Sequence, residues 1–311
     1  MYSNVSRNKT YTNRLIDFIW QEYKIKSINI SPAKRGYYGE TWRLNAIDRS
    51  YFIKLDYSPA HKVVYENSFP VMEHLCNYGV DFISKIVKTS QGKLCANFDK
   101  AILGVFEWID GNHIENNDTK ILEYQMLAKV YTVPVGNLAI PHEKFTNTSA
   151  STYFDKWAKI ETDSKALDFF EQNHTLLEHS ATRLKYFAEL CAKNKSHFYI
   201  THGDAGGNFI MNDEKNYIID WDEAMCTPPE RDAWVMCCHD WARELFNKTL
   251  LQNNIDYVLR PERLAYYCYH MFFFYLNAII DGCTPAEMTT EIKERLLNGW
   301  IEERLGYADK L

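Results

Sequence analysis

Two aspartates in the second half of the chain have the surroundings of a catalytic pair. Asp204 follows a short apolar run at Phe198–Ile200 and a His-Gly pair. Asp220 lies sixteen residues further on, directly after Ile218 and Ile219. This spacing predicts a strand, a loop, a tight β-hairpin and a second loop that returns to the first. A base and a metal ligand brought together in this way are typical of phosphoryl transfer.

The two aspartates suit different roles. Asp204 is predicted to be the catalytic base, because a carboxylate on a loop can accept the proton of an attacking hydroxyl. Asp220 is predicted to hold Mg²⁺, a hard cation that prefers carboxylate and phosphate oxygens. His202 is expected to hold the loop in place by hydrogen bonds rather than to act as a base.

A glycine turn and a lysine near the N-terminus predict a site for phosphates. Gly36 and Gly39 enclose a Gly-x-x-Gly turn between two expected strands. Backbone N–H groups in such a turn can approach a phosphate closely. Lys54 lies within the strand Tyr51–Leu55, where a lysine is costly to bury unless an anion meets it. An ordinary hairpin turn and a solvent-facing lysine are the plainer alternatives.

Two further segments extend this predicted nucleotide site. Glu66 and Glu73 lie on the next expected helix, and either is a candidate to pair with Lys54. Glu66 is preferred because it is nearer the helix start. In the connector after the next apolar strand, the backbone groups of Glu107 and Ile109 are predicted to meet an adenine edge. A plain edge strand is the alternative.

The charge distribution favours an anionic ligand at one end of the chain and a cationic ligand at the other. The chain has a net charge of −6. Residues 201–311 contain 19 acidic and 10 basic residues, a net of −9, so the first 200 residues carry +3. Asp222, Glu223 and Glu230 are therefore candidates to hold a cationic substrate. Random surface charge is the alternative.

The elements around these residues change character along the chain. Period-two patterns predict strands in the first part, and period-3.6 patterns predict mostly helices after residue 110. We expect an α+β fold with a small antiparallel sheet in residues 1–107 and a larger helical part in residues 108–311. The strands are expected at Ile28–Ser31, Thr41–Asn45, Tyr51–Leu55, Phe82–Val87, Leu94–Phe98 and Ile102–Trp108. The helices are expected at Tyr11–Lys24, Val63–Tyr78, Lys120–Tyr131, Ser151–Ile160, Lys165–Gln172, Thr175–Ala192, Asp232–Leu251, Arg260–Asp281 and Pro285–Gly306.

Composition excludes several classes of protein. The longest apolar run, near Met271–Ile280, is too short to span a bilayer, and the N-terminus lacks a signal-peptide pattern. No Lys/Arg cluster suggests nucleic-acid binding. Eight irregularly spaced cysteines indicate reduced thiols in a cytoplasmic protein. Cys237–Asp240 contain metal-ligand residue types, but consecutive helical positions point in different directions. The aromatic stripe Tyr266–Tyr275 suggests helix core rather than a cage for a cation.

The ordered set of motifs resembles the aminoglycoside phosphotransferase and choline kinase superfamily, relatives of protein kinases. The resemblance covers roughly residues 28–240 and implies a bilobal protein-kinase-like fold that uses ATP, or GTP, with Mg²⁺. It implies that Lys54 touches the α- and β-phosphates, that Asp204 is the base and that Asp220 is the main Mg²⁺ ligand. Asp232 would stabilise a loop at the start of a helix, which is also an N-cap position.

One residue of the catalytic loop is missing relative to the kinase pattern. That pattern places a metal-binding asparagine five residues after the aspartate, whereas Asn208 comes four residues after Asp204. Gly206 and Gly207 can absorb the deficit, because glycines reach dihedral angles closed to other residues. We predict that Asn208 remains a metal ligand. The alternative is a weakened or lost second metal site.

These features predict an ATP- and Mg²⁺-dependent phosphotransferase that acts on a hydroxyl of a small cationic substrate, as a monomer or homodimer. An aminoglycoside or aminocyclitol antibiotic is the first candidate substrate, which implies a role in antibiotic resistance. Choline and amino sugars are alternatives. Two other functions remain open: a kinase fold that binds its ligand without turnover, and a metal phosphohydrolase built on His202, Asp204, His239 and Asp240.

Overall fold

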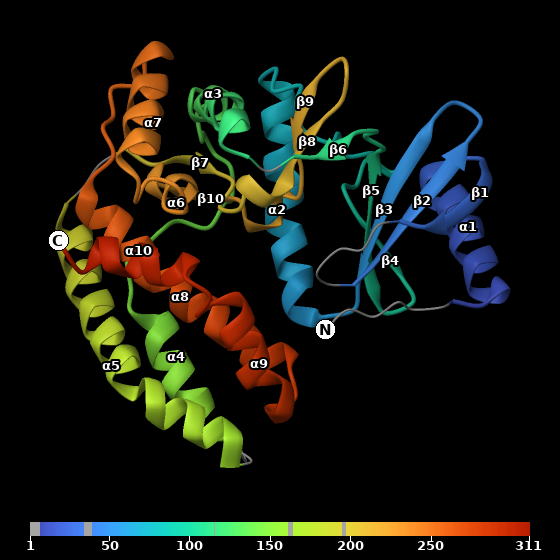
Figure 1. Cartoon of the computed structure of the whole chain (residues 1–311). Coiled ribbons are helices and arrows are strands. Elements are labelled where there is room, and N and C mark those ends of the chain that lie inside the picture. The colour runs from blue at the N-terminus through green and yellow to red at the C-terminus, as the bar shows by residue number, and fades with distance from the viewer. Residues whose placement is uncertain (1–6, 34–38, 115, 161–163, 195–196) are drawn as a thin grey trace. The chain divides into compact units, whose positions relative to one another are not determined.

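The computed structural model describes the chain except residues 1–6, 34–38, 115, 161–163 and 195–196 (Figure 1). The chain forms two compact units. The first unit comprises Met1–Pro141 and His202–Cys226, and the second comprises His142–Thr201 and Thr227–Leu311. The division at residue 107 expected from the sequence stays a prediction.

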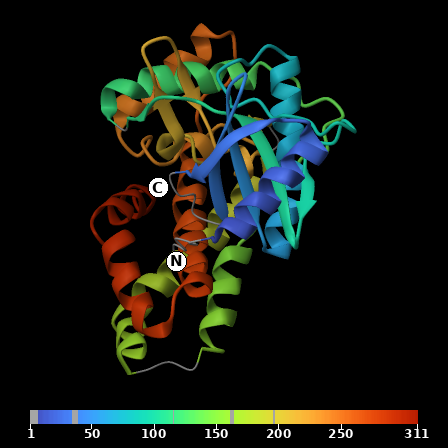
Figure 2. The same cartoon turned by 90° about the vertical axis from the view of Figure 1, so that its right-hand side faces the viewer.

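The first unit is built on a five-stranded antiparallel sheet with the strand order β1-β2-β3-β5-β4. The strands are β1 (Ser27–Pro32), β2 (Glu40–Ala46), β3 (Ser50–Asp56), β4 (Ala96–Phe98) and β5 (Ala101–Glu107). Helix α1 (Lys9–Tyr23) lies along the sheet in both views (Figures 1 and 2). Helix α2 (Pro59–Asn77) follows β3 and ends just before Gly79, as predicted.

The two faces of this sheet have different partners. Ile53 and Leu55 on β3 pack in a core with Leu15 and Ile19 of α1. Because side chains alternate along a strand, Lys54 between them points to the opposite face. Helix α2 contributes to that face, since the Tyr65 ring lies 5.2 Å from the Lys54 ammonium. The sheet therefore holds Lys54 on the side away from the α1 core.

A short hairpin carries the predicted catalytic loops. It is formed by β8 (Phe209–Met211) and β9 (Asn216–Ile218), and β6 (Asn112–His113) pairs with β8 on its other edge. The hairpin is confirmed, whereas β6 is too short for its pattern to be recognised. The remaining elements of this unit are η1 (Asn117–Thr119), α3 (Lys120–Tyr131), η2 (Gly206–Asn208) and η3 (Trp221–Glu223), followed by β10 (Met225–Thr227).

Several predicted elements have different extents. Phe82–Val87 is not a strand: it makes an isolated bridge, Ile86 with Phe106, because β4 occupies the neighbouring part of the same β5 edge. The two helices expected within residues 165–192 are one helix, α5 (Ser164–Lys193). The helix expected at Asp232–Leu251 is divided into α6 (Glu230–Ala233) and α7 (Asp240–Gln252).

The second unit is mainly helical. Its elements also include α4 (Thr148–Trp157), β7 (Tyr199–Thr201), α8 (Pro261–Gly282), α9 (Pro285–Arg295) and α10 (Trp300–Ala308). Helix α8 packs against α4, α5 and α10 and is the centre of this unit (Figure 2). The final helix expected at Pro285–Gly306 is interrupted by Gly299, which has a φ of 103°. No helix among the described residues has the length and apolar character to cross a membrane.

Most of the aromatic stripe of α8 is helix core, as expected, whereas Phe274 within it is 40% exposed. Tyr266, Tyr267, Tyr269, Phe272 and Phe273 are each at most 1% exposed. Aromatic side chains this deeply buried stabilise the packing of the surrounding helices. The stripe therefore serves the core of the second unit.

Candidate active site

Lys54 and Asp220 meet in the first unit although 166 residues separate them in the chain. The Lys54 Nζ lies 2.7 Å from Asp220 Oδ1 and 2.5 Å from Asp222 Oδ2. The lysine is 8% exposed, so its ammonium is buried against both carboxylates. The structure thus brings together the predicted phosphate-binding lysine and the predicted metal ligand.

The three charged side chains of this cluster, Lys54, Asp220 and Asp222, shift one another's pKa values. Burial would lower the pKa of Lys54, but Asp220 and Asp222 outweigh it and raise that pKa well above its usual value. Burial raises the pKa of Asp220, but Lys54 outweighs it and the net shift is downward. Burial and the neighbouring Asp220 raise the pKa of Asp222 against the effect of Lys54. Two carboxylates share one ammonium, so the cluster carries an excess negative charge that favours a further cation.

The backbone of Asp220 is held in a special conformation by its neighbours. Asp220 has a φ of 60° and a ψ of 62°, in the left-handed region, which aspartate tolerates better than most residues. The next residue, Trp221, is fully buried, and its Nε1 donates to the carbonyl of Ile218 at 2.9 Å. This anchored tryptophan fixes the turn that presents the Asp220 carboxylate.

His202 links the loops that contain Asp204 and Asp220 by hydrogen bonds, as expected. Its ring packs on Trp221 with the centroids 4.6 Å apart. Nε2 lies 2.8 Å from the carbonyl of Ile219, and Nδ1 lies 3.1 Å from the backbone nitrogen of Asp204. Nδ1 must accept the bond from that N–H, so Nε2 carries the proton and donates to Ile219. A neutral, fully buried imidazole therefore joins the Asp204 loop to the Asp220 loop.

The shortened loop is closed by a 3₁₀ turn. The Asn208 N–H donates to the carbonyl of Ala205 at 3.0 Å, within η2. Asn208 Nδ2 donates to the Asp204 carbonyl at 2.8 Å and lies 3.2 Å from Asp204 Oδ2. The Ile219 N–H donates to the Asn208 carbonyl at 3.0 Å, so Asn208 faces the residue before Asp220 across the hairpin. The amide nitrogen is turned toward Asp204, which leaves the side-chain oxygen as an acceptor.

The sequence of the chain matches a known family. The family model for the phosphotransferase enzyme family matches residues 29–267. The chain belongs to the phosphotransferase enzyme family. The resemblance to aminoglycoside phosphotransferases and choline kinases is confirmed, and so is the prediction of a phosphotransferase with an alcohol group as acceptor.

Solved structures share the fold of this phosphotransferase over nearly its whole length. Spectinomycin phosphotransferase with ADP and spectinomycin aligns with a TM-score of 0.75 at 17% identity, covering 96% of this chain and 98% of that chain. Choline kinase from Streptococcus pneumoniae aligns with a TM-score of 0.61 at 14% identity, covering 97% and 98%. No curated protein matches the sequence. At these identities the likeness concerns the fold, and the predicted kinase-like α+β class is confirmed.

The predicted phosphate-binding turn is described only at its end. Gly36 lies outside the described residues. Gly39 has a φ of 70°, and a Cβ there would overlap the carbonyl oxygen of Leu55 on the neighbouring strand. Position 39 therefore requires glycine both for its dihedral angle and for the close approach of the backbone.

Replacing Gly39 with alanine is expected to lower the free energy of unfolding by about 2–4 kcal/mol, because strain and a backbone clash act together. Gly92→Ala is the matched control, since Gly92 has a φ of 79° but open space around its Cβ position. It should lose about 1–2 kcal/mol from the dihedral angle alone. Urea denaturation of both variants measures the difference, and equal losses would contradict the predicted clash.

The predicted ion pair between Lys54 and Glu66 is wrong. The Glu66 side chain is 51% exposed and lies 3.9 Å from Lys62 on its own helix. The alternative partner, Glu73, contacts Lys88. Asp220 and Asp222 take the place that was predicted for a helix glutamate. A glutamate facing solvent gains little from a buried lysine on the sheet, because water solvates it already.

In the connector after β5, the backbone groups of Glu107 and Ile109 differ in whether they already have hydrogen-bond partners. The Glu107 carboxylate pairs with Arg49 at 2.7 Å, and its carbonyl accepts the Ser84 hydroxyl at 2.8 Å. The Glu107 N–H donates to the Lys85 carbonyl. Among the described residues, none bonds the backbone N–H of Ile109. Ile109 is therefore the better placed of the two predicted residues to offer a hydrogen bond to a ligand.

The three predicted substrate-binding acids have different environments. Asp222 accepts a hydrogen bond from the buried Lys54, so its carboxylate already has a cationic partner, and its predicted contact with a substrate stays a prediction. Glu223 is exposed on η3, directly after Asp222. Of the three, Glu223 is the residue whose exposure suits contact with a substrate.

Glu230 is a structural residue of the second unit, which corrects its predicted role. It is fully buried, and both carboxylate oxygens accept from the Tyr257 hydroxyl, at 3.0 and 2.8 Å. The Arg260 N–H donates to Oε1 at 2.6 Å. Burial raises the pKa of Glu230 to about 7 against these hydrogen bonds. A carboxylate without exposed surface cannot hold a substrate from solvent.

Replacing Glu230 with alanine should lower the free energy of unfolding by about 3 kcal/mol, because it leaves buried donors unsatisfied and removes a carboxylate near the buried Arg263. Glu244→Ala, at an exposed position on α7, is the control and should stay within about 0.5 kcal/mol of wild type. Guanidinium denaturation followed by tryptophan fluorescence provides the measurement. Equal stability of the two variants would show that Glu230 has no structural role.

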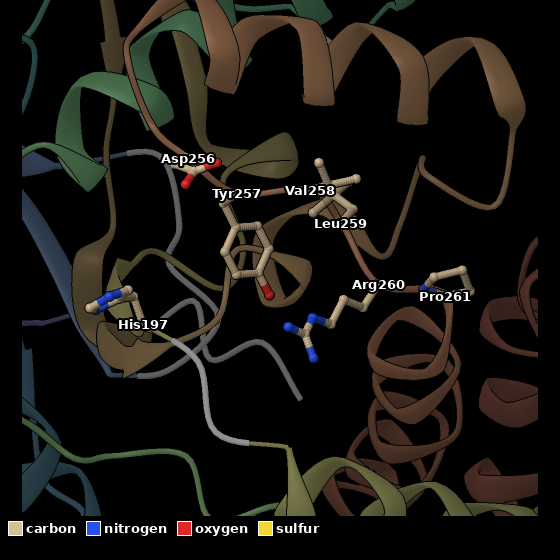
Figure 3. A pocket seen from close by; sticks show the side chains of 7 residues that line it. All are labelled: His197, Asp256, Tyr257, Val258, Leu259, Arg260 and Pro261. Carbon is tan, nitrogen blue, oxygen red and sulfur yellow. The ribbon is translucent and has the colours of Figure 1, made fainter.

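The second unit contains a cavity of about 450 Å³ (Figure 3). The cavity is lined by His197, Asp256, Tyr257, Val258, Leu259, Arg260 and Pro261. Tyr257 and Arg260 are the residues that bond Glu230. None of the residues that line this cavity is a predicted site residue. The cavity is therefore not part of the candidate active site formed by Lys54, Asp220 and Asp222.

Two other expectations concern the segment around α6. Asp232 lies inside this short helix, whose N-cap is Pro229, so its predicted N-cap position is wrong.

Cys238 and His239 lie in turns rather than on a helix, and their ligand atoms come within 4.8 Å of those of Glu303. However, Arg304 Nη1 donates to Glu303 Oε2 at 3.0 Å. This guanidinium opposes the binding of another cation there.

Sequence reasoning missed Lys120 and Tyr65. Both are buried in the first unit, and neither belongs to a recognisable motif. Tyr65 lies on the helix face that meets Lys54, a position that helical spacing from Phe69 could have indicated. No signal in the sequence shows that Lys120 is buried.

Proposed function

We propose that this phosphotransferase transfers the terminal phosphoryl group of ATP, or of GTP, to a hydroxyl of a small cationic substrate in the presence of Mg²⁺. The observation that carries the proposal is the buried contact of Lys54 with Asp220 and Asp222, next to the hydrogen-bonded pair Asp204 and Asn208. A lysine for phosphates, oxygen donors for a cation and an accessible carboxylate are the parts that phosphoryl transfer requires.

The donor set fits Mg²⁺. Asp220 and the side-chain oxygen of Asn208 would hold the ion, and both offer the oxygen atoms that this hard cation prefers. Bound Mg²⁺ would neutralise phosphate charge. The excess negative charge of the Lys54 cluster supports a cation at this place. The role of Asn208 as a ligand, in spite of the shortened loop, is part of the proposal.

Each remaining residue has a task that its environment allows. Lys54 is held on the sheet with its ammonium toward the carboxylates, from where it would bind nucleotide phosphates. Asp204 is exposed, so its carboxylate is open to an acceptor hydroxyl and would take its proton. The Gly36–Gly39 turn would approach the phosphates. The backbone of Ile109, with that of Glu107, would bond the base of the nucleotide.

The acceptor is proposed to be an aminoglycoside or aminocyclitol antibiotic, so the protein would confer resistance to it. Structural neighbours support a small hydroxyl-bearing substrate, since they include a spectinomycin phosphotransferase, a complex of APH(2")-IIa with streptomycin and ATP, and a choline kinase. The exposed Glu223 is the proposed contact for a substrate cation. Choline and amino sugars remain alternatives.

A screen for ADP release tests the proposal. The purified protein with MgATP or MgGTP is assayed against aminoglycosides, spectinomycin, choline and amino sugars. We expect acceptor-dependent ADP or GDP release with at least one amine-bearing alcohol. Release that does not depend on any acceptor would indicate a hydrolase instead.

A second function is favoured by the missing loop residue. A kinase fold with a weakened second metal site could bind nucleotide or a small ligand without turnover. Isothermal titration separates the two functions: nucleotide binding together with no transfer across the whole panel would support the binding protein. Transfer to any acceptor would exclude it.

We also propose that the protein works in the cytoplasm, as a monomer or homodimer. All eight cysteines are free, which suits a reducing compartment. Size-exclusion chromatography with light scattering would determine the oligomeric state.

A further inference from the structure

Lys120 is buried at the start of α3 in the first unit. Its side chain is 6% exposed, and its Nζ lies 2.7 Å from Oε2 of Glu123, which is 4% exposed. Among the described residues, Lys54 and Lys120 are the buried lysines. Burying an ammonium costs several kcal/mol, roughly, even where a carboxylate accompanies it. A pair of this kind therefore calls for an explanation beyond stability.

The ammonium of Lys120 lies beside the catalytic loop. A Cβ placed on Gly206 would be 3.1 Å from Lys120 Nζ. Gly206 comes two residues after the proposed base, Asp204. The loop between Asp204 and Asn208 consists of one alanine and two glycines, so it offers no polar side chain of its own. Lys120 thus brings a cation to the place where this shortened loop has only backbone.

The contact with Glu123 does not use all the N–H donors of the Lys120 ammonium. An ammonium group has three N–H donors. Glu123 accepts one of them, and no other acceptor for this ammonium is found in the part of the chain that the structure describes. Glu123 fixes the direction of the lysine, while the remaining donors stay available on the side of Gly206.

We propose that Lys120 is a catalytic residue that donates to an oxygen of the transferred phosphoryl group, and that Glu123 is its positioning residue. This inference rests on the proposed function. Phosphoryl transfer is promoted almost entirely by positioning and by cations placed against the charge on the phosphoryl oxygens. Lys54, on the sheet, is proposed to bind the α- and β-phosphates, and Lys120, on α3, supplies a second cation to the transferred phosphoryl group. Lys120 acts as a hydrogen-bond donor and forms no covalent bond.

The test replaces the ion pair by a neutral pair of similar size. Lys120→Met alone would leave a buried carboxylate and risk misfolding, so the main variant is Lys120→Met/Glu123→Gln. Glu123→Gln alone keeps the cation. Lys129→Met, at an exposed position of the same helix, is the matched control. Each protein is compared with wild type in thermal unfolding, in affinity for ATP and ADP, and in turnover.

The double variant should unfold at a temperature close to that of wild type and bind ADP with similar affinity. Its turnover should fall by about 10²–10³-fold, and it should bind ATP more weakly, because only ATP carries the phosphoryl group that Lys120 contacts. Glu123→Gln should keep turnover within about tenfold of wild type, since the cation remains. Lys129→Met should behave as wild type.

Two results would overturn the inference: wild-type turnover and ATP affinity in the double variant, or a parallel loss of ADP affinity, ATP affinity and unfolding temperature. The latter would assign Lys120 a purely structural role. Failure of the proposed function is seen separately, as absence of transfer by the wild-type protein. In that case the difference between ATP and ADP affinity still decides whether Lys120 meets the terminal phosphate.

Discussion

Replacing Asp204 with asparagine is expected to reduce phosphate transfer by about 10²–10⁴-fold, the usual contribution of general-base catalysis. Asparagine has the size of aspartate but cannot accept the proton of the acceptor hydroxyl. The loop should keep its shape, because it is held by backbone atoms: the residue-204 N–H bonds His202, and its carbonyl accepts from Asn208. Coupled measurement of ADP release, alongside nucleotide titration, provides the test.

Asp213→Asn is the control for this variant. Asp213 is exposed in the turn of the same hairpin, so its replacement should leave activity and nucleotide affinity unchanged. If Asp204→Asn were as active as Asp213→Asn, the assignment of the base would be incorrect. A loss of nucleotide binding in Asp204→Asn would instead indicate that the carboxylate maintains the site.

Replacing Asp220 with asparagine should lower turnover by about a thousandfold, corresponding to several kcal/mol of metal-dependent stabilisation. The change removes one of the two carboxylates that contact Lys54 and the proposed main ligand of Mg²⁺. The concentration of Mg²⁺ that supports half-maximal activity should rise. A magnesium titration of activity measures both effects.

Asp222→Asn distinguishes the two carboxylates. It keeps the contact between Lys54 and Asp220 at 2.7 Å, so its loss of activity and its shift in Mg²⁺ requirement should be smaller. The opposite order, with Asp222→Asn the more damaged enzyme, would transfer the main metal-binding role from Asp220 to Asp222.

Much of the fold could be predicted because its local patterns are consistent. Leu15, Ile19 and Tyr23 recur at helical spacing, and all three are buried against the sheet. The alternating strand that contains Lys54 is equally plain. The Phe82–Val87 segment is not the strand that its pattern predicts, because whether an apolar run becomes a strand depends on which strand edge is free to pair with it. That edge is determined by β4 and β5, and not by the segment itself.

The site was only partly predictable, for a different reason. Residue type indicates charge, and neighbouring motifs indicate which loops meet, so Asp204, Asp220 and Lys54 could be found. Neither the residue type nor the neighbouring motifs indicate whether a side chain is buried or exposed. Glu66, predicted to pair with Lys54, is on the surface, and Glu230, predicted to hold a cationic substrate, is fully buried. Lys120 was missed because its position beside Gly206 depends on how α3 packs under the loop.

The loop from Asp204 to Asn208 is one residue shorter than the kinase pattern, and its local backbone geometry compensates for the missing residue. The 3₁₀ turn within η2 uses fewer residues per turn than an α-helix would. It returns the chain to the hairpin so that Asn208 still bonds Asp204 and still faces Ile219. This geometry supports an active enzyme over a kinase fold that only binds its ligand.

In the proposed function the Asp204 and Asp220 loops together transfer a phosphoryl group to an alcohol. Phosphorus-31 NMR of the wild-type protein with MgATP and an acceptor from the screen tests it most directly. We predict a new phosphomonoester resonance that grows in step with ADP and is absent with Asp204→Asn. ADP formed together with inorganic phosphate alone, or ATP bound but unchanged with every acceptor, would contradict the claim.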